Sequence, residues 1–284
     1  MTSELHTSER RLTTDMVSDP AMYRLILAVR PTSLDVVILS RVRENDVIFR
    51  HIDFQAGSDT LSALEEAVYD NPLLTADFHR IDVMVENNRF FIMASEEATD
   101  DEKRRRIAAL WPPEQTEDEL QAMENVIEDG RTTFVWAIER RLIQFMRRTW
   151  NNPLVHHRLG VLTRYYTLKS HLGNMGKVNV CVWQDKTDVI VSGRDGLLMA
   201  NTFATPGGTE DAVYYTMATA QHFDFNMETD RIIVGGESAM RAAFIESARR
   251  FVPLTMPEIY PSAINTLTAS QKDIPYEALL LTLL

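Results

Sequence analysis

The sequence predicts an α/β protein with an internal duplication, made of two β-β-β-α-β halves with mixed sheets flanked by helices. The first observation is residues 177–203, where β-branched and polar residues alternate around two polar turns, as in three consecutive antiparallel strands. The second is residues 22–54, which repeat this pattern. When AVRPTSLDVVIL at 28–39 is set above CVWQDKTDVIVS at 181–192, Asp35 falls on Asp188.

A third observation is that the same two elements follow each meander. In the first half, an amphipathic helix with an acidic cap precedes a strand at 79–86. In the second half, a helix from Thr209 precedes a strand from Arg231. We therefore divide the chain into a first half at 1–175 and a second half at 176–284.

Local patterns predict the remaining elements of the first half. We expect the first 12 residues or so to be loose, followed by strands at 22–30, 33–42 and 46–55 and a helix at 58–71 that ends before Pro72. The Asn87-Asn88 pair predicts a hairpin that leads into a strand from Phe90. The composition then shifts, and we expect a helical insertion at about 96–130, with one helix from Asp100 to Pro112 and an acidic one over 114–129.

The first helix of this insertion carries a basic run, residues 103–106, directly after three acidic residues. One interpretation is a phosphate-binding patch. The other is a solvated helix face whose charges suit the helix dipole, and we favour this second interpretation because acids flank the run.

The end of the first half contains two adjacent histidines. A strand is expected at 132–138, a helix at 139–149, a short strand near Val155, a helix at 161–171 and the seam between the halves at 173–176. His156 and His157 point to opposite faces of a strand, so they do not share a metal ion without a bend. We therefore predict no metal site.

Two glycine pairs precede helices in the second half. Gly207-Gly208 suggests either an anion cradle or a plain helix cap, and we favour the cap. Gly235-Gly236 ends a strand and leads to a helix at 239–251. The chain ends in an apolar segment, residues 276–284, which is too short to span a bilayer and is expected to dock on the body of the protein.

Composition excludes several classes of protein. With 284 residues, 45% of them hydrophobic, the chain is long enough to bury full cores. The net charge of −12 argues against a nucleic-acid partner, although it leaves room for a local basic patch. The one cysteine, Cys181, forms no internal disulfide, and we find no signal peptide and no membrane-spanning run. We expect a cytoplasmic protein.

Two β-β-β-α-β copies followed by helices resemble the actin-like ATPase (ribonuclease H-like) fold of actin, sugar kinases and heat-shock chaperones. Within it, the chain looks most like the actin-like proteins of pilus assembly and cell division, and like a small uncharacterised bacterial family with this fold. The resemblance covers nearly the whole chain. It rests on an Asp-Val-Ile core, an Asn-Thr-Phe strand end, a Glu-Asp-x-x-Tyr-Tyr helix and a Gly-Gly-Glu turn, at 188–190, 201–203, 210–215 and 235–237.

The resemblance also implies what is missing. In active members, the first hairpin of each half begins with an aspartate that orients Mg²⁺, and glycines in its turn present amides to the phosphates of ATP. Here Ala28 and Cys181 occupy the two aspartate positions. The small turn residues are replaced as well, by Arg30, Pro31, Trp183 and Gln184. The resemblance therefore implies a pseudo-ATPase, without catalytic residues and without ordinary ATP hydrolysis.

What the resemblance preserves is the turn Gly235, Gly236, Glu237 and Ser238, at the place where active members approach adenosine. These residues are our candidate for a residual nucleotide site that binds ATP with Mg²⁺. Asp185 and Asp188 are candidate replacement metal ligands, but Asp188 has its counterpart in Asp35, which favours a structural role such as accepting turn amides.

Three hypotheses about function follow. The preferred one is a non-catalytic actin-like scaffold that binds another protein, through the insertion at 96–130 or the apolar C-terminus. The alternative is a nucleotide-binding ATPase or kinase with atypical ligands. A nuclease is the third, and the absence of an aspartate on the first strand of either half argues against it. The sequence does not set the oligomeric state, for which a homodimer is one option.

Overall fold

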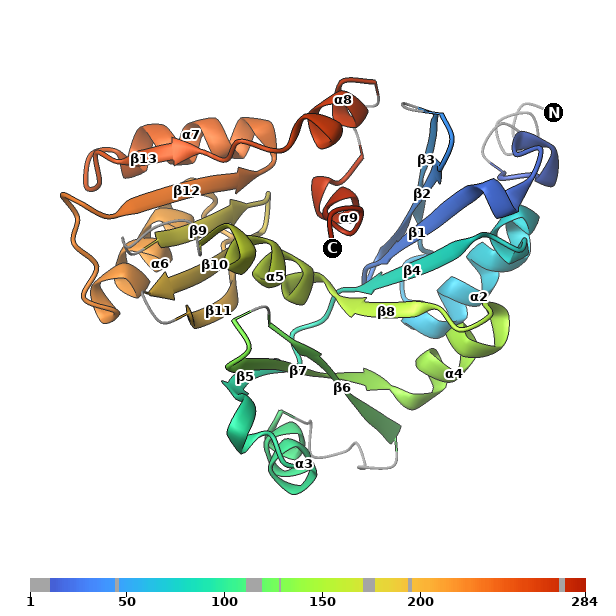
Figure 1. The fold of residues 1–284 in the computed structure, drawn as a ribbon, viewed down its shortest axis with the longest axis horizontal. Helices are drawn as coiled ribbons and strands as arrows, with labels where there is room; N and C mark the ends of the chain where they lie inside the picture. Colours follow the sequence, from blue (N-terminus) through green and yellow to red (C-terminus); the bar gives the residue numbers. More distant parts are fainter. Residues whose placement is uncertain are drawn as a thin grey trace.

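Two five-stranded sheets with matching strand orders form the centre of the protein (Figure 1). The computed structural model describes residues 11–43, 46–110, 119–127, 129–170, 177–193, 196–270 and 274–284. The first sheet has the order β3-β2-β1-β4-β8 and the second β11-β10-β9-β12-β13. Both halves therefore have the mixed sheets that the sequence predicts.

The strands of the first sheet run as expected from the alternating pattern. They are β1 (Tyr23–Val29), β2 (Ser33–Ser40), β3 (Val47–Asp53), β4 (Arg80–Val85) and β8 (Leu154–His157). β1 is antiparallel to β2 and parallel to β4, so it lies in the middle of the sheet, where its last five residues are buried.

The second sheet repeats this register. Its strands are β9 (Lys177–Val182), β10 (Lys186–Gly193), β11 (Gly196–Ala204), β12 (Arg231–Gly236) and β13 (Thr255–Pro257). Ala28 pairs with Asp35 across β1 and β2, and Cys181 pairs with Asp188 across β9 and β10. The two meanders thus pair the aligned residues in the same register, while an internal duplication stays a prediction.

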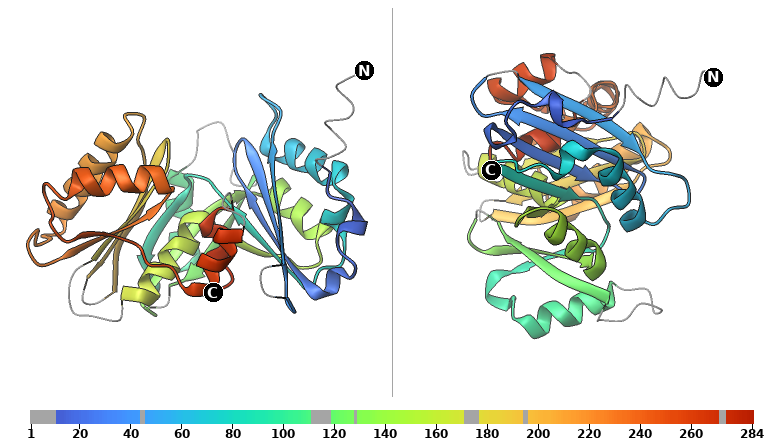
Figure 2. Two further views of the ribbon diagram at one scale, coloured as in Figure 1. Left: turned by 90° about the horizontal axis from the view of Figure 1, so that it is seen from above. Right: turned by 90° about the vertical axis from the view of Figure 1, so that its right-hand side faces the viewer.

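Helices cover both sheets and fill the space between them (Figure 2). On the outer faces lie α2 (Thr60–Asp70) and α4 (Arg140–Thr149) in the first half, and α6 (Thr209–His222) and α7 (Ser238–Ala248) in the second. Between the sheets lie α5 (Arg158–Ser170) and α9 (Tyr276–Leu280), and α8 (Ser262–Ser270) leads to α9. Short 3₁₀ helices are η1 (Thr14–Met16), η2 (Pro20–Met22), η3 (Pro72–Thr75) and η4 (Ser95–Glu97).

A third sheet corrects the hairpin predicted at Asn87-Asn88. The strand after this turn, β5 (Phe90–Ala94), leaves the first sheet and pairs with β7 (Thr132–Glu139) in a separate sheet of order β5-β7-β6. The Asn87 side chain fixes this departure, because it donates to the Ala137 carbonyl and accepts from the Arg89 amide.

The acidic helix predicted over 114–129 is also wrong where the structure describes it. Residues 120–126 form strand β6 (Leu120–Val126), which pairs with β7 along its whole length. Cross-strand pairing here overrides the helix preference of the sequence LQAMENV. The rest of that prediction at 114–118 and the seam at 173–176 lie outside the described residues, so the division of the chain at 175 stays a prediction.

The helix α3 (Asp100–Ala109) of the insertion confirms the solvated interpretation of the basic run. Thr99 caps its N-terminus. Lys103 pairs with Asp100 and Glu124, while Arg105 and Arg106 both pair with Glu102. The run is therefore largely neutralised by acids of its own subdomain.

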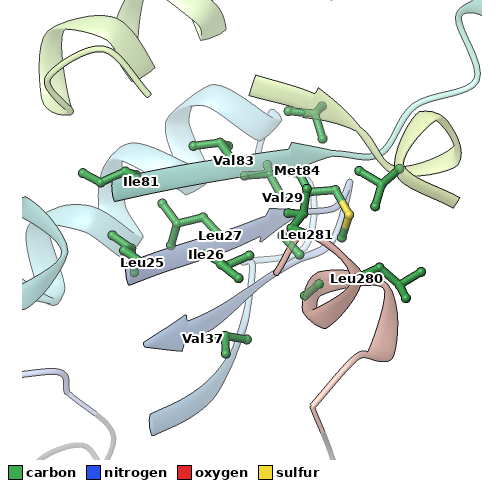
Figure 3. Close-up of a cluster of buried hydrophobic side chains, with 14 of the residues drawn as sticks. Leu25, Ile26, Leu27, Val29, Val37, Ile81, Val83, Met84, Leu280 and Leu281 are labelled. Atoms are coloured by element: carbon green, nitrogen blue, oxygen red, sulfur yellow. The ribbon is translucent and has the colours of Figure 1, made fainter. Parts of the chain in front are cut away.

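The apolar C-terminus docks inside the protein, as predicted (Figure 3). Leu280 and Leu281 are almost fully buried and lie against the strands of the first sheet. The Arg24 guanidinium donates to the Leu281 carbonyl at 2.9 Å. The suggestion that this segment offers a surface to a partner is therefore wrong, because it is covered by its own chain. No helix among the described residues is both long and apolar enough to cross a bilayer.

Two leucines of this segment give a matched test of its docking. Leu280 is fully buried, whereas Leu283 is 39% exposed. We expect Leu280→Ala to lower the free energy of unfolding by about 3 kcal/mol and Leu283→Ala by less than about 1 kcal/mol, measured by urea denaturation. Equal losses would show that the segment does not pack as described.

Candidate functional site

The candidate site lies between the halves, where two pockets open on either side of a group of charged side chains. The larger pocket, of about 850 Å³, is lined by Arg30, Trp183, Tyr276 and Gly236–Ser238, among others. The smaller, of about 550 Å³, is lined by Pro31, Glu86, Arg158 and Thr202, among others. Asp185 and Lys186 border both pockets, so the charged group separates them.

The two positions at which the resemblance implies aspartates are buried here. Ala28 is 1% exposed and Cys181 is fully buried. The Cys181 thiol lies 3.4 Å from the Tyr166 hydroxyl. Burial, and then the charge of Asp188, raise the pKa of the thiol to about 12, so the thiolate is not populated at neutral pH.

The paired aspartates on the second strands are saturated with donors. Asp188 accepts two hydrogen bonds from Arg158, at 2.6 and 2.8 Å, one from the Trp183 indole at 2.7 Å and one from the Thr202 hydroxyl at 2.6 Å. Burial raises the pKa of Asp188, but these donors, Arg158 above all, outweigh that effect and lower it.

Asp35 has the equivalent arrangement in the first half. It accepts from the Arg30 guanidinium and bonds to the His51 ring. Arg30 and Trp183 begin the matching turns. The Arg30 amide donates to the Ser33 carbonyl, and the Trp183 amide donates to the Lys186 carbonyl. The predicted structural role of these aspartates fits their contacts, but the donors are side chains and not turn amides.

Glu86 joins the two halves. Its carboxylate pairs with Arg30 from the first hairpin, at 3.5 Å, with Arg158 at the start of α5, at 3.4 Å, and with Lys186 from the second hairpin. Burial raises the pKa of Glu86, but the Arg158 and Lys186 cations outweigh it, so that the pKa lies below its ordinary value of 4.5. Glu86 is therefore ionised at neutral pH and holds three cations from different parts of the chain.

Two residues of the C-terminal helix α9 contact this group of charged side chains. Glu277 is 1% exposed and accepts from Arg30 at 2.9 Å. The Tyr276 ring stacks on Trp183 with a centroid separation of 5.5 Å, and the Arg158 guanidinium lies 5.4 Å from the Trp183 ring. The space between the two hairpin turns is thus filled by the side chains of the protein.

The candidate nucleotide residues divide into two groups. Gly236, Glu237 and Ser238 line the larger pocket. Gly235 lies beneath it, where an added Cβ would come within 2.6 Å of the Tyr166 hydroxyl and 2.9 Å of the Tyr260 hydroxyl. Nucleotide binding by these four residues stays a prediction.

Other motifs have structural roles. The Gly207 amide donates to Asp211, so a carboxylate of α6 already occupies the loop that suggested an anion cradle. His156 bonds to Asp82, and His157 bonds to the Asn87 carbonyl among three aromatic rings. In the part of the chain that the structure describes, no three His, Cys, Asp or Glu side chains are grouped to hold a metal ion.

Sequence reasoning missed Glu86. The Glu86 amide donates to the Val29 carbonyl just as the Glu237 amide donates to the Val182 carbonyl, so the two glutamates occupy equivalent positions after β4 and β12. Extending the alignment of these strands by one residue would have singled out Glu86. Its partners Arg158 and Lys186 come together only through the fold.

Comparisons with known proteins agree with this architecture. A family model described as "Protein of unknown function (DUF3822)" matches residues 14–254. A search of the curated proteins finds no match to the sequence. Among solved structures, the chain is similar to a Bacteroides thetaiotaomicron protein with an actin-like ATPase fold and unknown function, at 17% identity and a TM-score of 0.71, over 88% of this chain and 96% of that one.

Two further structures are more distant. The PilM-PilN type IV pilus biogenesis complex matches at 10% identity and a TM-score of 0.54, over 92% of this chain and 97% of that one. The activator of the 2-hydroxyisocaproyl-CoA dehydratase from Clostridium difficile, with bound ADPNP, matches at 9% identity and a TM-score of 0.39, over 89% and 98% of the two chains. The fold is the actin-like ATPase fold that the resemblance implied.

The charged group predicts a specific dependence of stability on pH. Because the pKa of Glu86 is lowered in the folded protein, its contribution is complete above the ordinary pKa of 4.5 and is lost as the pH falls through the folded value. We expect Glu86→Gln to lower the free energy of unfolding by about 2 kcal/mol near pH 7, and we expect the difference from the wild type to shrink below about pH 4. Urea denaturation over this pH range checks it; a difference independent of pH would contradict it.

Gly236 supplies a test of the turn itself. Its φ is +98°, and an added Cβ would lie 2.1 Å from the Val182 carbonyl oxygen. We expect Gly236→Ala to cost about 3 kcal/mol of folding stability. The matched control is Gly208→Ala, which also has a positive φ, of +66°, but open space around the Cβ, and should cost about 1 kcal/mol. Similar losses in thermal unfolding would mean that the close approach to Val182 is not maintained.

Proposed function

The chain belongs to the DUF3822 family of proteins of unknown function, and we propose that it is a non-catalytic actin-like scaffold that binds another protein. The observation that carries this proposal is the Glu86-centred ion-pair group between the hairpin turns. In active proteins of this fold that space belongs to the phosphates and Mg²⁺.

The carboxylates in this space do not suit a magnesium ion. Mg²⁺ requires oxygen ligands with free lone pairs in a near-octahedral arrangement. Both carboxylate oxygens of Asp188 accept hydrogen bonds, four in total, and Glu86 forms ion pairs with three cations. Ala28 and Cys181 offer no oxygen in their places. A metal would have to break these pairs and leave buried arginines uncompensated, which is costly.

The turns do not suit a triphosphate either. The amides of Arg30 and Trp183 are used within their own hairpins, and Pro31 has no amide proton. The cations near the turns are paired with Asp35, Glu86, Asp188 and Glu277, so an entering phosphate would meet four carboxylates. These features support a pseudo-ATPase whose turns have lost phosphate binding.

One structure that shares the fold is a protein complex, which supports protein binding. The PilM-PilN structure is a complex of two proteins, one of which has this fold, and we extend that role to this chain. The subdomain built on β5, β6, β7 and α3 stands apart from the two main sheets and is the surface we nominate (Figure 1). A cytoplasmic location, consistent with a single reduced cysteine, is part of the proposal, and a homodimer is one option for its assembly.

One observation favours the alternative, a nucleotide-binding ATPase or kinase with atypical ligands. The larger pocket, of about 850 Å³, has room for a small ligand and is bordered by Gly236, Glu237 and Ser238. This alternative requires ATP and Mg²⁺ to bind without the two hairpin aspartates.

Thermal unfolding with nucleotide separates the two functions. A ligand present at 100 times its dissociation constant stabilises by about 2.7 kcal/mol, which raises the Tm by roughly 5 °C or more for a chain of this size. We expect about 1 mM ATP with Mg²⁺ to shift the Tm by less than about 1 °C, because Arg30, Arg158 and Lys186 at the hairpin turns are already paired with carboxylates.

The Ala28→Asp/Cys181→Asp double variant is the control for this measurement. We expect it to gain no ATP hydrolysis, because its turns still lack glycines and the amides of Arg30 and Trp183 remain bonded within their own hairpins. A Mg²⁺-dependent rise of several degrees in the wild type, reduced by a substitution at Ser238, would overturn the scaffold proposal in favour of the alternative.

A further inference from the structure

Helix α4 has an exposed face made almost entirely of arginine. Its sequence, RRLIQFMRRT, contains no acidic residue. Leu142, Ile143 and Met146 are buried against the body of the first half. We call the opposite side the arginine face; its members, all exposed, are Arg140, Arg141, Gln144, Arg147 and Arg148.

Helix geometry organises these side chains into two stripes. Residues seven apart nearly coincide in direction around a helix, so Arg140 lies in line with Arg147, and Arg141 with Arg148. Gln144 lies between the stripes. Each stripe is about 10 Å long at a rise of about 1.5 Å per residue. The helix lies on the side of the first sheet that faces away from the second half (Figures 1 and 2).

The arginines of this face differ from the basic run on α3 in their pairing. Among the residues that the structure describes, Arg141, Arg147 and Arg148 have no hydrogen bond or ion pair. On α3, by contrast, Arg105 and Arg106 pair with Glu102. Arg140 differs, because it donates to the Leu120 carbonyl. Arg141, Arg147 and Arg148 thus form an uncompensated positive surface on a protein whose net charge is −12.

The position of Arg141 is not explained by the stability of the helix. Cations favour the C-terminus of a helix, where Arg147 and Arg148 lie, and disfavour the first turn. The first turn of α4 nevertheless contains Arg141 and no acidic residue. An external anion at this end would offset the unfavourable interaction with the helix dipole.

We propose that the arginine face binds an acidic, extended segment of another protein. Guanidinium groups pair with carboxylates in a bidentate manner, and a 10 Å stripe matches acidic residues about three apart in an extended chain. Nucleic acids and anionic membranes are extended polyanions, which the net charge of −12 repels at long range, whereas a short segment meets only the local field. This inference deepens the proposed scaffold function by giving the chemistry of the partner.

The test uses the full chain and a labelled peptide of about twelve residues with glutamate at every third position, at about 50 mM salt. We expect fluorescence anisotropy to show binding that weakens as salt increases and that the glutamine version of the peptide lacks. Arg141→Glu/Arg148→Glu should lower the affinity at least about tenfold. The matched control, Arg41→Glu/Arg43→Glu, changes the charge equally at two exposed arginines after β2, outside both nominated surfaces, and should alter the affinity less than about twofold.

Circular dichroism and the Tm establish whether both variants fold. If Arg141→Glu/Arg148→Glu does not fold, Arg141→Gln/Arg148→Gln replaces it. Absence of peptide binding, or an equal loss in the Arg41→Glu/Arg43→Glu control, overturns the proposal. Tighter binding of duplex DNA or of phosphatidylserine vesicles, lost with the α4 substitutions, overturns the assignment of the partner as a protein. None of these results alters the nucleotide measurement, so failure of this inference is distinct from failure of the scaffold function.

Discussion

The carboxylate of Glu86 forms ion pairs with three parts of the chain that meet between the hairpin turns. Arg30 and Lys186 come from equivalent hairpins of the two halves, and Arg158 comes from the helix that runs between them. A charge pair of this kind is stable when its lone pairs and protons are satisfied together. The second-strand aspartates, the Trp183 indole and Glu277 add further partners, so the network is extensive. Glu86 Oε2 and Arg158 Nε make an ion pair at 3.4 Å without a hydrogen bond. Ion pairs of the protein itself consequently bridge the space between the hairpin turns, with one pocket on either side.

The C-terminal segment depends on the same network. Tyr276 stacks on Trp183, Glu277 accepts from Arg30, and the leucines that follow fill the first core. Because α9 has only five residues, tertiary contacts and not helix propensity hold it in place. A segment that seemed apolar enough to attract a partner is instead part of the closure. The surface we propose for a partner is the arginine face of α4, where Arg141, Arg147 and Arg148 have no ion pair among the described residues.

Much of the fold could be predicted from sequence, because the alternation of residues in each meander is local and repeated. The pairing of Ala28 with Asp35 and of Cys181 with Asp188 follows directly from that alternation. Strand β6 could not be predicted in this way, since most of its residues, LQAMENV, favour a helix and only pairing with β7 makes them a strand. Glu86 could have been found from its equivalence to Glu237, but its three cations lie far apart in sequence. Local patterns do not reveal such contacts.

We infer that the space between the hairpins is a site of ion pairs and not of phosphate binding. A structure of crystals grown with excess Mg²⁺ and a non-hydrolysable ATP analogue tests this inference most directly. The result expected is Glu86 in contact with Arg30, Arg158 and Lys186, with no triphosphate between the turns. A triphosphate and its cation in that space, with Glu86 displaced from the arginines, would contradict the account.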